Sequence, residues 1–398
     1  MHKILIVTRE YPTTAEGGIA RRLSKTVPRL LDLGLEVGVV TFSSSSIAGE
    51  TVYPIATTSK ILYTHMGEPS SGDFASIIND IWRLDRYADE ISRKKGYELV
   101  QIEEPIFGPF IESPLPRIVT VHNTQSCVAM AYLKTLAGPR QLKRLLFSGI
   151  VGYGFDYTCL HGCDRVIAVS PSVKDEIVRY YHMSSSAIEI VPNGLDLPPM
   201  NAKSSEMTKG QSDMLTIACV GRLVDVKRVD VLLKALAHLK AVSSAKFRCY
   251  VIGTGPSASA LKSLSNKLAL EDEVTFTGFI TDEALSNILA AADIVVSPSD
   301  YETFGFSVYE GALYNCAPVV SRIPAFTSIL VDGSNSLMFE PGDEAQLAAK
   351  LEQLGSDRAL LGKIQRNARF LAEGMGWDDS VRKLVRVYSR LLDGHTAS

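Results

Sequence analysis

The chain has 398 residues, too many for one ordinary hydrophobic core, so two domains are expected. Its 41 basic and 44 acidic residues leave a formal charge of −3, which gives no support for a nucleic-acid-binding protein. There is no run of roughly 18 uninterrupted apolar residues, as a membrane-spanning helix needs, and the N-terminus enters a strand rather than a signal peptide. Six scattered cysteines are expected to be reduced and mostly buried, which suits a cytoplasmic protein.

In the first half of the chain, short β-branched runs alternate with amphipathic stretches of helix length. A helix is expected from Ala20 to Gly34, with a basic face formed by Arg21, Arg22, Lys25 and Arg29. Alternating strands and helices predict a parallel sheet built from βαβ units. The expected strands are Lys3–Thr8, Glu36–Phe42, Lys60–Thr64, Leu99–Glu103, Arg117–His122, Arg165–Ser170 and Ala187–Val191.

Residues 197–213 interrupt this pattern with prolines, serines and charges, and predict a linker. The alternation then restarts, so the expected organisation is a first domain over 1–196, a second over 214–376 and a terminal helix within 377–398. Two doubly wound, Rossmann-like α/β domains of this kind are expected to face a ligand-binding cleft. The expected strands of the second half are Met214–Val220, Phe247–Ile252, Glu273–Thr277, Asp293–Ser297, Pro318–Ser321 and Ser336–Phe339.

The most informative motif runs from Glu302 to Glu310 and contains Phe304-Gly305-Phe306. It follows an apolar strand, so Glu302 falls on a strand-to-helix loop and Glu310 about one turn into the helix. Backbone N–H groups and a helix N-terminus suit an anionic or many-hydroxyl ligand. Carboxylates suit vicinal hydroxyls, so the pattern indicates a site for a sugar nucleotide at the edge of the sheet.

Two further loops leave strands with phosphate-binding chemistry. Gly17-Gly18 opens the basic helix and allows a diphosphate to approach the backbone. It is not a G-x-G-x-x-G fingerprint, so a nicotinamide cofactor is weakly supported. Arg222 and Lys227 follow the first strand of the second half and are expected to converge on phosphates. No Asp-x-Asp pair stands at a strand exit, so the sequence does not support a metal-held diphosphate.

Weaker signals stand at other strand ends. His122 follows an apolar strand, and a structural role competes with a functional one there. Ser170 is explained by capping of the next helix. Pro192-Asn193-Gly194 predicts a turn with left-handed backbone. Gly278 and Ile280 flank Phe279 and are candidates to frame a base, although a core position explains them as well.

Together these residues resemble the retaining glycosyltransferases of family 4, which have the GT-B fold. The resemblance covers nearly the whole chain, and the Glu302…Glu310 signature is its most specific part. It implies a hexosyltransferase that uses a nucleoside diphosphate sugar, with UDP or GDP expected as the nucleotide, and needs no metal or other cofactor. It also implies that the first domain binds an unknown hydroxyl acceptor and that the C-terminal helix returns to that domain.

The resemblance also assigns roles to individual residues. Glu310 would hold the ribose hydroxyls, and His122 would lie beside the sugar. The remaining assignments are Glu302 and the backbone of Phe304, Gly305 and Phe306 at the donor sugar, Arg222 and Lys227 at the diphosphate, Gly17 and Gly18 closing on it, and Ser170, Asn193, Gly278 and Ile280 around the donor. Asn123 replaces the aspartate that many relatives carry after the histidine, which weakens any role for a carboxylate there.

Alternatives remain open from the sequence. A nucleotide-sugar isomerase or hydrolase would need its own acid or base in the first domain, and no clear carboxylate cluster is evident there. A catalytically silent sugar-nucleotide-binding protein and a pyridoxal-dependent phosphorylase are also conceivable. The basic helix and the stretch Leu133–Phe147 suit peripheral contact with the inner face of a membrane or a phosphorylated acceptor, but solvated helix faces explain them equally well.

Overall fold

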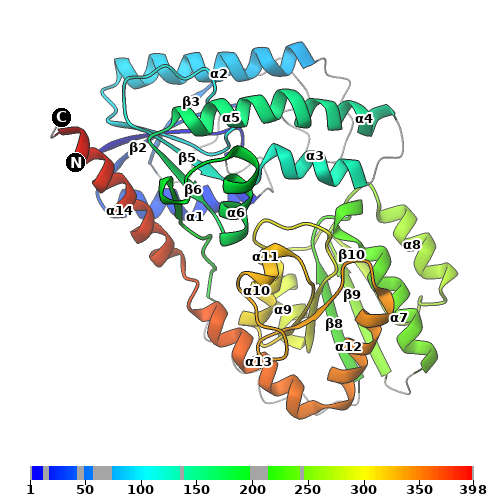
Figure 1. The fold of residues 1–398 in the computed structure, drawn as a ribbon. Coiled ribbons are helices and arrows are strands. Elements are labelled where there is room, and N and C mark those ends of the chain that lie inside the picture. The colour runs from blue at the N-terminus through cyan, green and yellow to red at the C-terminus, as the bar shows by residue number, and fades with distance from the viewer. Residues whose placement is uncertain are drawn as a thin grey trace. The chain divides into compact units, whose positions relative to one another are not determined.

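The structure is a computed structural model that describes residues 2–11, 18–42, 49–56, 74–134, 139–197, 214–242 and 246–396. Gly17, the expected strand Lys60–Thr64 and nearly all of the expected linker 197–213 lie outside these residues. The chain forms two compact units (Figure 1). Unit 1 comprises Met1–Gly194 and Trp377–Ser398, and unit 2 comprises Leu195–Gly376.

Unit 1 contains a parallel sheet of seven strands in the order β3-β2-β1-β4-β5-β6-β7. Its order reverses between β1 and β4, the point at which open α/β sheets place ligands. The short edge strand β3 was not expected, and it ends in a proline, which only an edge strand accommodates readily. The strands are β1 (Lys3–Val7), β2 (Glu36–Thr41), β3 (Thr51–Pro54), β4 (Leu99–Ile102), β5 (Arg117–Val121), β6 (Arg165–Ala168) and β7 (Ile188–Ile190).

Helices cover both faces of this sheet. On one face α1 (Gly18–Asp32) and α14 (Trp377–Thr396) pack against residues such as Ile4 and Ile118. On the other face lie α2 (Phe74–Lys94), α5 (Tyr153–Gly162) and α6 (Pro171–Tyr181). The remaining helices are α3 (Gln125–Lys134), α4 (Pro139–Leu146), the π-helix η2 (Phe147–Gly152) and the 3₁₀ turn η3 (Ser185–Ala187).

The last helix, α14, belongs to unit 1 although 182 residues of unit 2, Leu195 to Gly376, precede it. Its side chains at helical spacing, Val381, Leu384 and Tyr388, are each about 1% exposed and join the α1 side of the core. At its start Trp377 lies so close to the chain that a Cβ on Gly194 would be 2.5 Å from the Trp377 Cα. This contact requires the glycine. The expected left-handed backbone at Asn193-Gly194 is wrong, because neither residue has a positive φ.

Unit 2 contains a second parallel sheet, ordered β10-β9-β8-β11-β12-β13, with the same reversal between β8 and β11. The strands are β8 (Met214–Val220), β9 (Lys246–Ile252), β10 (Val274–Gly278), β11 (Ile294–Ser297), β12 (Ala317–Ser321) and β13 (Leu337–Phe339). The helices are η5 (Asp225–Lys227), α7 (Val229–Val242), α8 (Ala258–Lys267), α9 (Asp282–Ala291), α10 (Phe306–Leu313), α11 (Pro324–Thr327), α12 (Glu344–Ser356) and α13 (Arg358–Glu373).

In unit 2 the helices α7, α8 and α12 cover one face of the sheet, and α9 and α10 cover the other. The expected class, two doubly wound Rossmann-like α/β domains, is therefore confirmed. All six cysteines are free thiols, and only Cys163 is not fully buried. Among the described helices none combines the length and the hydropathy needed to cross a bilayer.

Candidate functional site

The carboxyl ends of β8 and β11 enclose a crevice in unit 2. The two strands are neighbours, so the loops that follow them leave the same edge of the sheet. Arg222 and Lys227 come from the loop after β8, and Glu302 comes from the loop after β11. The structure thus brings together three of the expected catalytic residues at the reversal of strand order, where the sequence pattern placed the ligand.

Lys227 and Glu302 form an ion pair inside this crevice, with 2.5 Å between Nζ and Oε1. The Glu302 side chain is only 11% exposed, so the lysine compensates a largely desolvated carboxylate. Ser299 Oγ donates a second hydrogen bond of 3.0 Å to the same oxygen. Ser321 Oγ in turn donates to the Ser299 carbonyl oxygen at 2.5 Å, and this hydrogen bond holds the loop after β11 in place.

Arg228 ties the two loops together, and the sequence reasoning did not single it out. Its backbone is left-handed, with φ of 48°. Its Nη1 lies 3.0 Å from Asp300 Oδ2 and its Nε lies 3.1 Å from Asp230 Oδ1. The hydrogen bonds to Asp230 and Asp300 raise the pKa of Arg228, which therefore stays charged. The only sequence signal was Asp230 two positions after Arg228, and such charged neighbours are common on surface helices.

Gly305 shapes the start of α10. It has φ of +85°, and a Cβ there would lie 2.5 Å from Phe326 Cε1, so only glycine fits without rearrangement. Phe304 is buried against Phe306 and Tyr309, so its side chain belongs to the core. In the described part of the chain the N–H groups of Phe304 and Gly305 have no hydrogen-bond acceptor.

Glu310 is the fifth residue of α10 and is half-buried. Gly278 ends β10 with φ of +71°, and its carbonyl oxygen accepts a 3.0 Å hydrogen bond from Gly253 N. Ile280 packs partly into the hydrophobic cluster beside α9, whereas Phe279 between them is 68% exposed. The loops after β9 and β10 are therefore joined, and the aromatic side chain projects from that edge.

In unit 1, His122 stands directly after β5 and is 8% exposed. Its Nε2 lies 2.8 Å from Oε2 of Glu103, which follows the neighbouring strand β4. Sequence reasoning found the histidine and missed the glutamate. The available signal was the alternation Gln101-Ile-Glu103, which places polar side chains on one face of an otherwise apolar strand.

Gly18 is the first residue of α1. One turn later Arg22 is fully buried, so the expectation that it belongs to an outward basic face is wrong. Arg22 Nη1 donates a 2.9 Å hydrogen bond to Asn193 Oδ1, which makes Asn193 a holder of that guanidinium. Ser170 caps α6 by accepting a hydrogen bond from Val173 N. This cap explains Ser170, as the sequence predicted.

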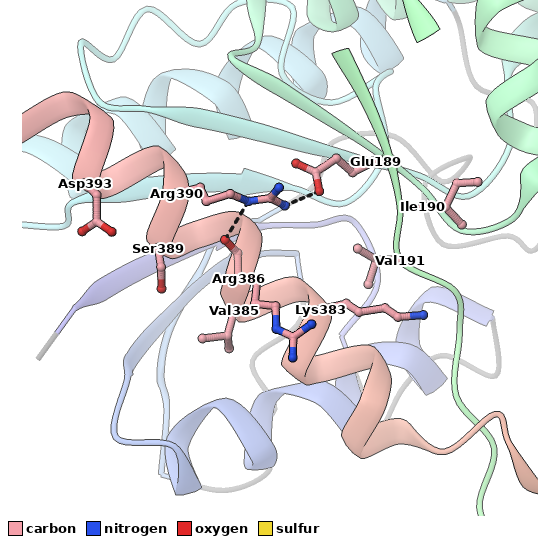
Figure 2. Close-up of a pocket in the computed structure, with 9 residues that line it drawn as sticks. All are labelled: Glu189, Ile190, Val191, Lys383, Val385, Arg386, Ser389, Arg390 and Asp393. Carbon is pink, nitrogen blue, oxygen red and sulfur yellow. Dashed lines mark hydrogen bonds and ion pairs between the residues drawn. The ribbon is translucent and has the colours of Figure 1, made fainter. Parts of the chain in front are cut away.

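A separate groove of about 490 Å³ runs between β7 and α14 (Figure 2). None of the expected site residues lines it. Its basic side chains are Lys383, Arg386 and Arg390, and Arg390 pairs with Glu189. Among the described residues there is no group of three histidine, cysteine or carboxylate side chains placed to hold a metal ion.

Comparison with known proteins shows which protein families this chain is similar to. A family model described as glycosyl transferases group 1 matches residues 203–370, and one described as glycosyltransferase family 4 matches residues 16–198. An uncharacterized glycosyltransferase of Methanocaldococcus jannaschii is 24% identical over 409 residues, which cover 97% of each chain.

Solved structures are also similar over nearly the whole chain. Sucrose-phosphate synthase of Thermosynechococcus elongatus matches with a TM-score of 0.77 and 18% identity, covering 99% of this chain and 100% of that one. The Anabaena protein HepE, solved with UDP and glucose, matches with a TM-score of 0.70 and 17% identity, covering 98% and 100%. At these identities the likeness establishes the arrangement of elements.

Proposed function

Because the chain belongs to the group 1 glycosyltransferases and has their two-domain GT-B fold, we propose that it transfers a sugar from a nucleoside diphosphate sugar to a hydroxyl acceptor with retention and without a metal. The observation that carries the proposal is the crevice at the ends of β8 and β11. It combines a guanidinium, an ammonium and a carboxylate, those of Arg222, Lys227 and Glu302.

The cations of the crevice fit the departing diphosphate. Arg222 and Lys227 lie on one loop, and their charges offset negative charge that grows on the phosphate oxygens as the sugar leaves. Lys227 is already paired with Glu302, so a phosphate competes with that carboxylate for the ammonium. Released in part from the lysine, Glu302 can accept a hydrogen bond from a sugar hydroxyl.

The proposed reaction is a front-face displacement. The bond between the anomeric carbon and the phosphate oxygen breaks, and the acceptor oxygen bonds to the same face of that carbon. The acceptor proton goes to the leaving phosphate, which serves as the base. We assign Glu310 to the ribose hydroxyls, and the N–H groups of the loop before α10 to the donor.

A thermal-shift screen with UDP, GDP, ADP, TDP and their common sugar conjugates tests the donor class. Stabilisation of about 2.7 kcal/mol is expected when a nucleotide is present at 100 times its dissociation constant. UDP or GDP should raise Tm, and the shift should survive EDTA. The absence of a shift with every nucleotide would remove the crevice as a donor site. Activity that EDTA abolishes and magnesium restores would overturn metal independence.

For the acceptor side we propose peripheral contact with an anionic membrane. The helices α3, α4 and η2 expose large apolar side chains that the core does not need, and Lys143 is exposed among them. An exposed apolar surface with basic neighbours suits a lipid interface. These apolar residues are Met130, Leu133, Leu142, Leu146 and Ile150.

A further inference from the structure

Four polar side chains of unit 1 form a continuous hydrogen-bonded chain from α14 to the end of β5. The Tyr388 hydroxyl donates to Gln101 Oε1, and the amide of Gln101 donates to Glu103 Oε1. The other carboxylate oxygen, Oε2, lies 2.8 Å from His122 Nε2. The same Gln101 amide lies 3.4 Å from Thr120 Oγ1. Residues from three separate parts of the sequence therefore meet at one histidine.

Burial distinguishes the histidine from its partners. Tyr388 and Gln101 are each 1% exposed and Glu103 is 0% exposed, whereas His122 is 8% exposed. Burying an ionisable side chain costs free energy unless it is paired, so the fully buried carboxylate behind His122 needs a reason. The His122 imidazole is the most exposed of the four side chains. This indicates that the other three side chains serve to orient that ring.

The charge of Glu103 determines which nitrogen of His122 carries hydrogen. Burial alone raises the pKa of Glu103, but the hydrogen bond and charge of His122, the charge of buried Arg22 and the hydrogen bond from Gln101 outweigh it and lower the pKa overall. An ionised carboxylate only accepts hydrogen bonds. Nε2 of His122 must therefore be the protonated nitrogen. In the described part of the chain Nδ1 has no partner, so a singly protonated ring with its hydrogen on Nε2 has its lone pair on Nδ1.

We propose that Glu103 is a positioning residue that fixes the Nε2–H tautomer of His122, so that Nδ1 accepts a hydrogen bond from a substrate hydroxyl. Gln101 and Tyr388 hold the carboxylate in place, and Asn193 holds Arg22, which balances its charge. The role of Nδ1 rests on the proposed function, whereas the tautomer can be measured without substrate. If these buried hydrogen bonds have no such role, His122 should be a mixture of its two neutral tautomers.

The decisive experiment is nitrogen-15 NMR of the full-length protein labelled at histidine, with the His122 signal assigned from the spectrum of His122→Gln. In the neutral form of the ring, the wild type should show His122 as the Nε2–H tautomer. Glu103→Gln should give a mixture of tautomers, because an amide can donate as well as accept. The control is Glu104→Gln, which changes the neighbouring buried glutamate that faces Arg9 and should leave the His122 signal unchanged.

Tyr388→Phe keeps the test decisive if Glu103→Gln does not fold. It removes one hydroxyl at the far end of the chain and should shift the His122 signal in the same direction by a smaller amount. Tyr181→Phe is its control, because that hydroxyl donates to Asp156 instead. A pure Nε2–H tautomer in Glu103→Gln, or in Tyr388→Phe where the first variant does not fold, would overturn the proposal.

Once a donor is identified, turnover provides a second test of the proposal. Glu103→Gln should lower kcat by roughly 10- to 100-fold with a smaller effect on the KM of the donor, since a hydrogen bond to a charged group is lost behind the ring. Wild-type kcat in that variant would mean that the tautomer does not matter to the reaction. Because the NMR result is independent of activity, failure to find any donor would count against the proposed function alone.

Discussion

At the scale of single residues, unit 2 joins groups of opposite charge before any ligand arrives. The 2.5 Å pair of Lys227 and Glu302 keeps a nearly buried carboxylate from lying alone, and Arg228 does the same for Asp300 and Asp230. A buried charge without a partner costs several kcal/mol, so a ligand that displaces one partner has to replace it. A phosphate suits this exchange because its negative charge can replace that of Glu302 as the partner of Lys227.

Replacing Lys227 by alanine should lower turnover by roughly 100-fold or more, because the leaving diphosphate loses a cation. Steady-state kinetics with the identified donor measure this effect. The matched control is Lys240→Ala, which removes a surface pair with Glu273 at 2.8 Å and should leave turnover unchanged. Wild-type turnover in Lys227→Ala would exclude the assigned role.

Gly305→Ala should destabilise unit 2 by about 1–3 kcal/mol, since it adds a left-handed alanine and a clash with the Phe326 ring at 2.5 Å. Urea unfolding measures this loss. Gly333→Ala is the control, because Gly333 has φ of +73° but nothing within 4 Å of its Cβ position. Gly333→Ala should cost about 1 kcal/mol, because only the strain of the left-handed backbone remains. Equal losses in the two variants would show that the Phe326 contact carries no weight.

At the scale of elements, the periodicity of the sequence predicts the strands well, because buried parallel strands are short β-branched runs bounded by turns. Every expected strand that falls on described residues is present, with ends shifted by at most two residues. β3 was missed because Thr51–Pro54 is short and half-exposed, so it lacks the apolar run.

The site was predicted less completely than the strands. Arg222, Lys227 and Glu302, which the structure brings to one crevice, were singled out because they follow strands in motifs of recognised chemistry. Glu103 and Arg228 were missed because each acts through a partner distant in the sequence, and no local pattern encodes that. Arg22 was misplaced for a similar reason. Its partner Asn193 is 171 positions away, and a basic residue on an amphipathic helix reads as solvent-facing.

The helices α3, α4 and η2 carry an element-scale prediction about membranes. Changing Leu142 and Leu146 to serine should reduce sedimentation with vesicles rich in phosphatidylserine by roughly tenfold or more, since each buried leucine contributes about 1.5–3 kcal/mol. Phe370→Ser on α13 is the control, because that ring is 82% exposed in unit 2 and should not matter. Equal binding of both variants would contradict the assigned surface.

At the scale of the whole molecule, stability depends on buried carboxyl groups as well as on the two apolar cores. Burial raises the pKa of Asp156 to about 7, and hydrogen bonds from Gln125 N and the Tyr181 hydroxyl only partly offset that effect. The native protein therefore keeps this proton over a pH range in which the unfolded chain has lost it. Stability contributed by this group falls as pH rises from about 4 to about 7, by at most about 1.4 kcal/mol per pH unit.

Asp156→Asn should reduce this pH dependence. Its free energy of unfolding should fall at least about 1 kcal/mol less than that of the wild type between pH 5 and pH 7, measured by urea unfolding at each pH. Buried carboxyls that do not interact with Asp156, such as Asp85, contribute equally to both proteins and cancel in the difference. The exposed Asp272→Asn should follow the wild type. An unchanged slope in Asp156→Asn would place that carboxyl in its ionised form throughout.

The return of α14 to unit 1 has a consequence for synthesis on the ribosome. The sheet of unit 1 is translated by residue 194, but the helix that covers one of its faces begins only at Trp377. At 5–20 residues per second the interval is roughly ten to forty seconds. During that time Leu195–Gly376 can complete its own core, while the first-made half keeps apolar strand faces such as Ile118 and Ile167 uncovered. The half of the protein that is made first therefore completes its core last, and its uncovered strand face is open to chaperone binding while translation continues.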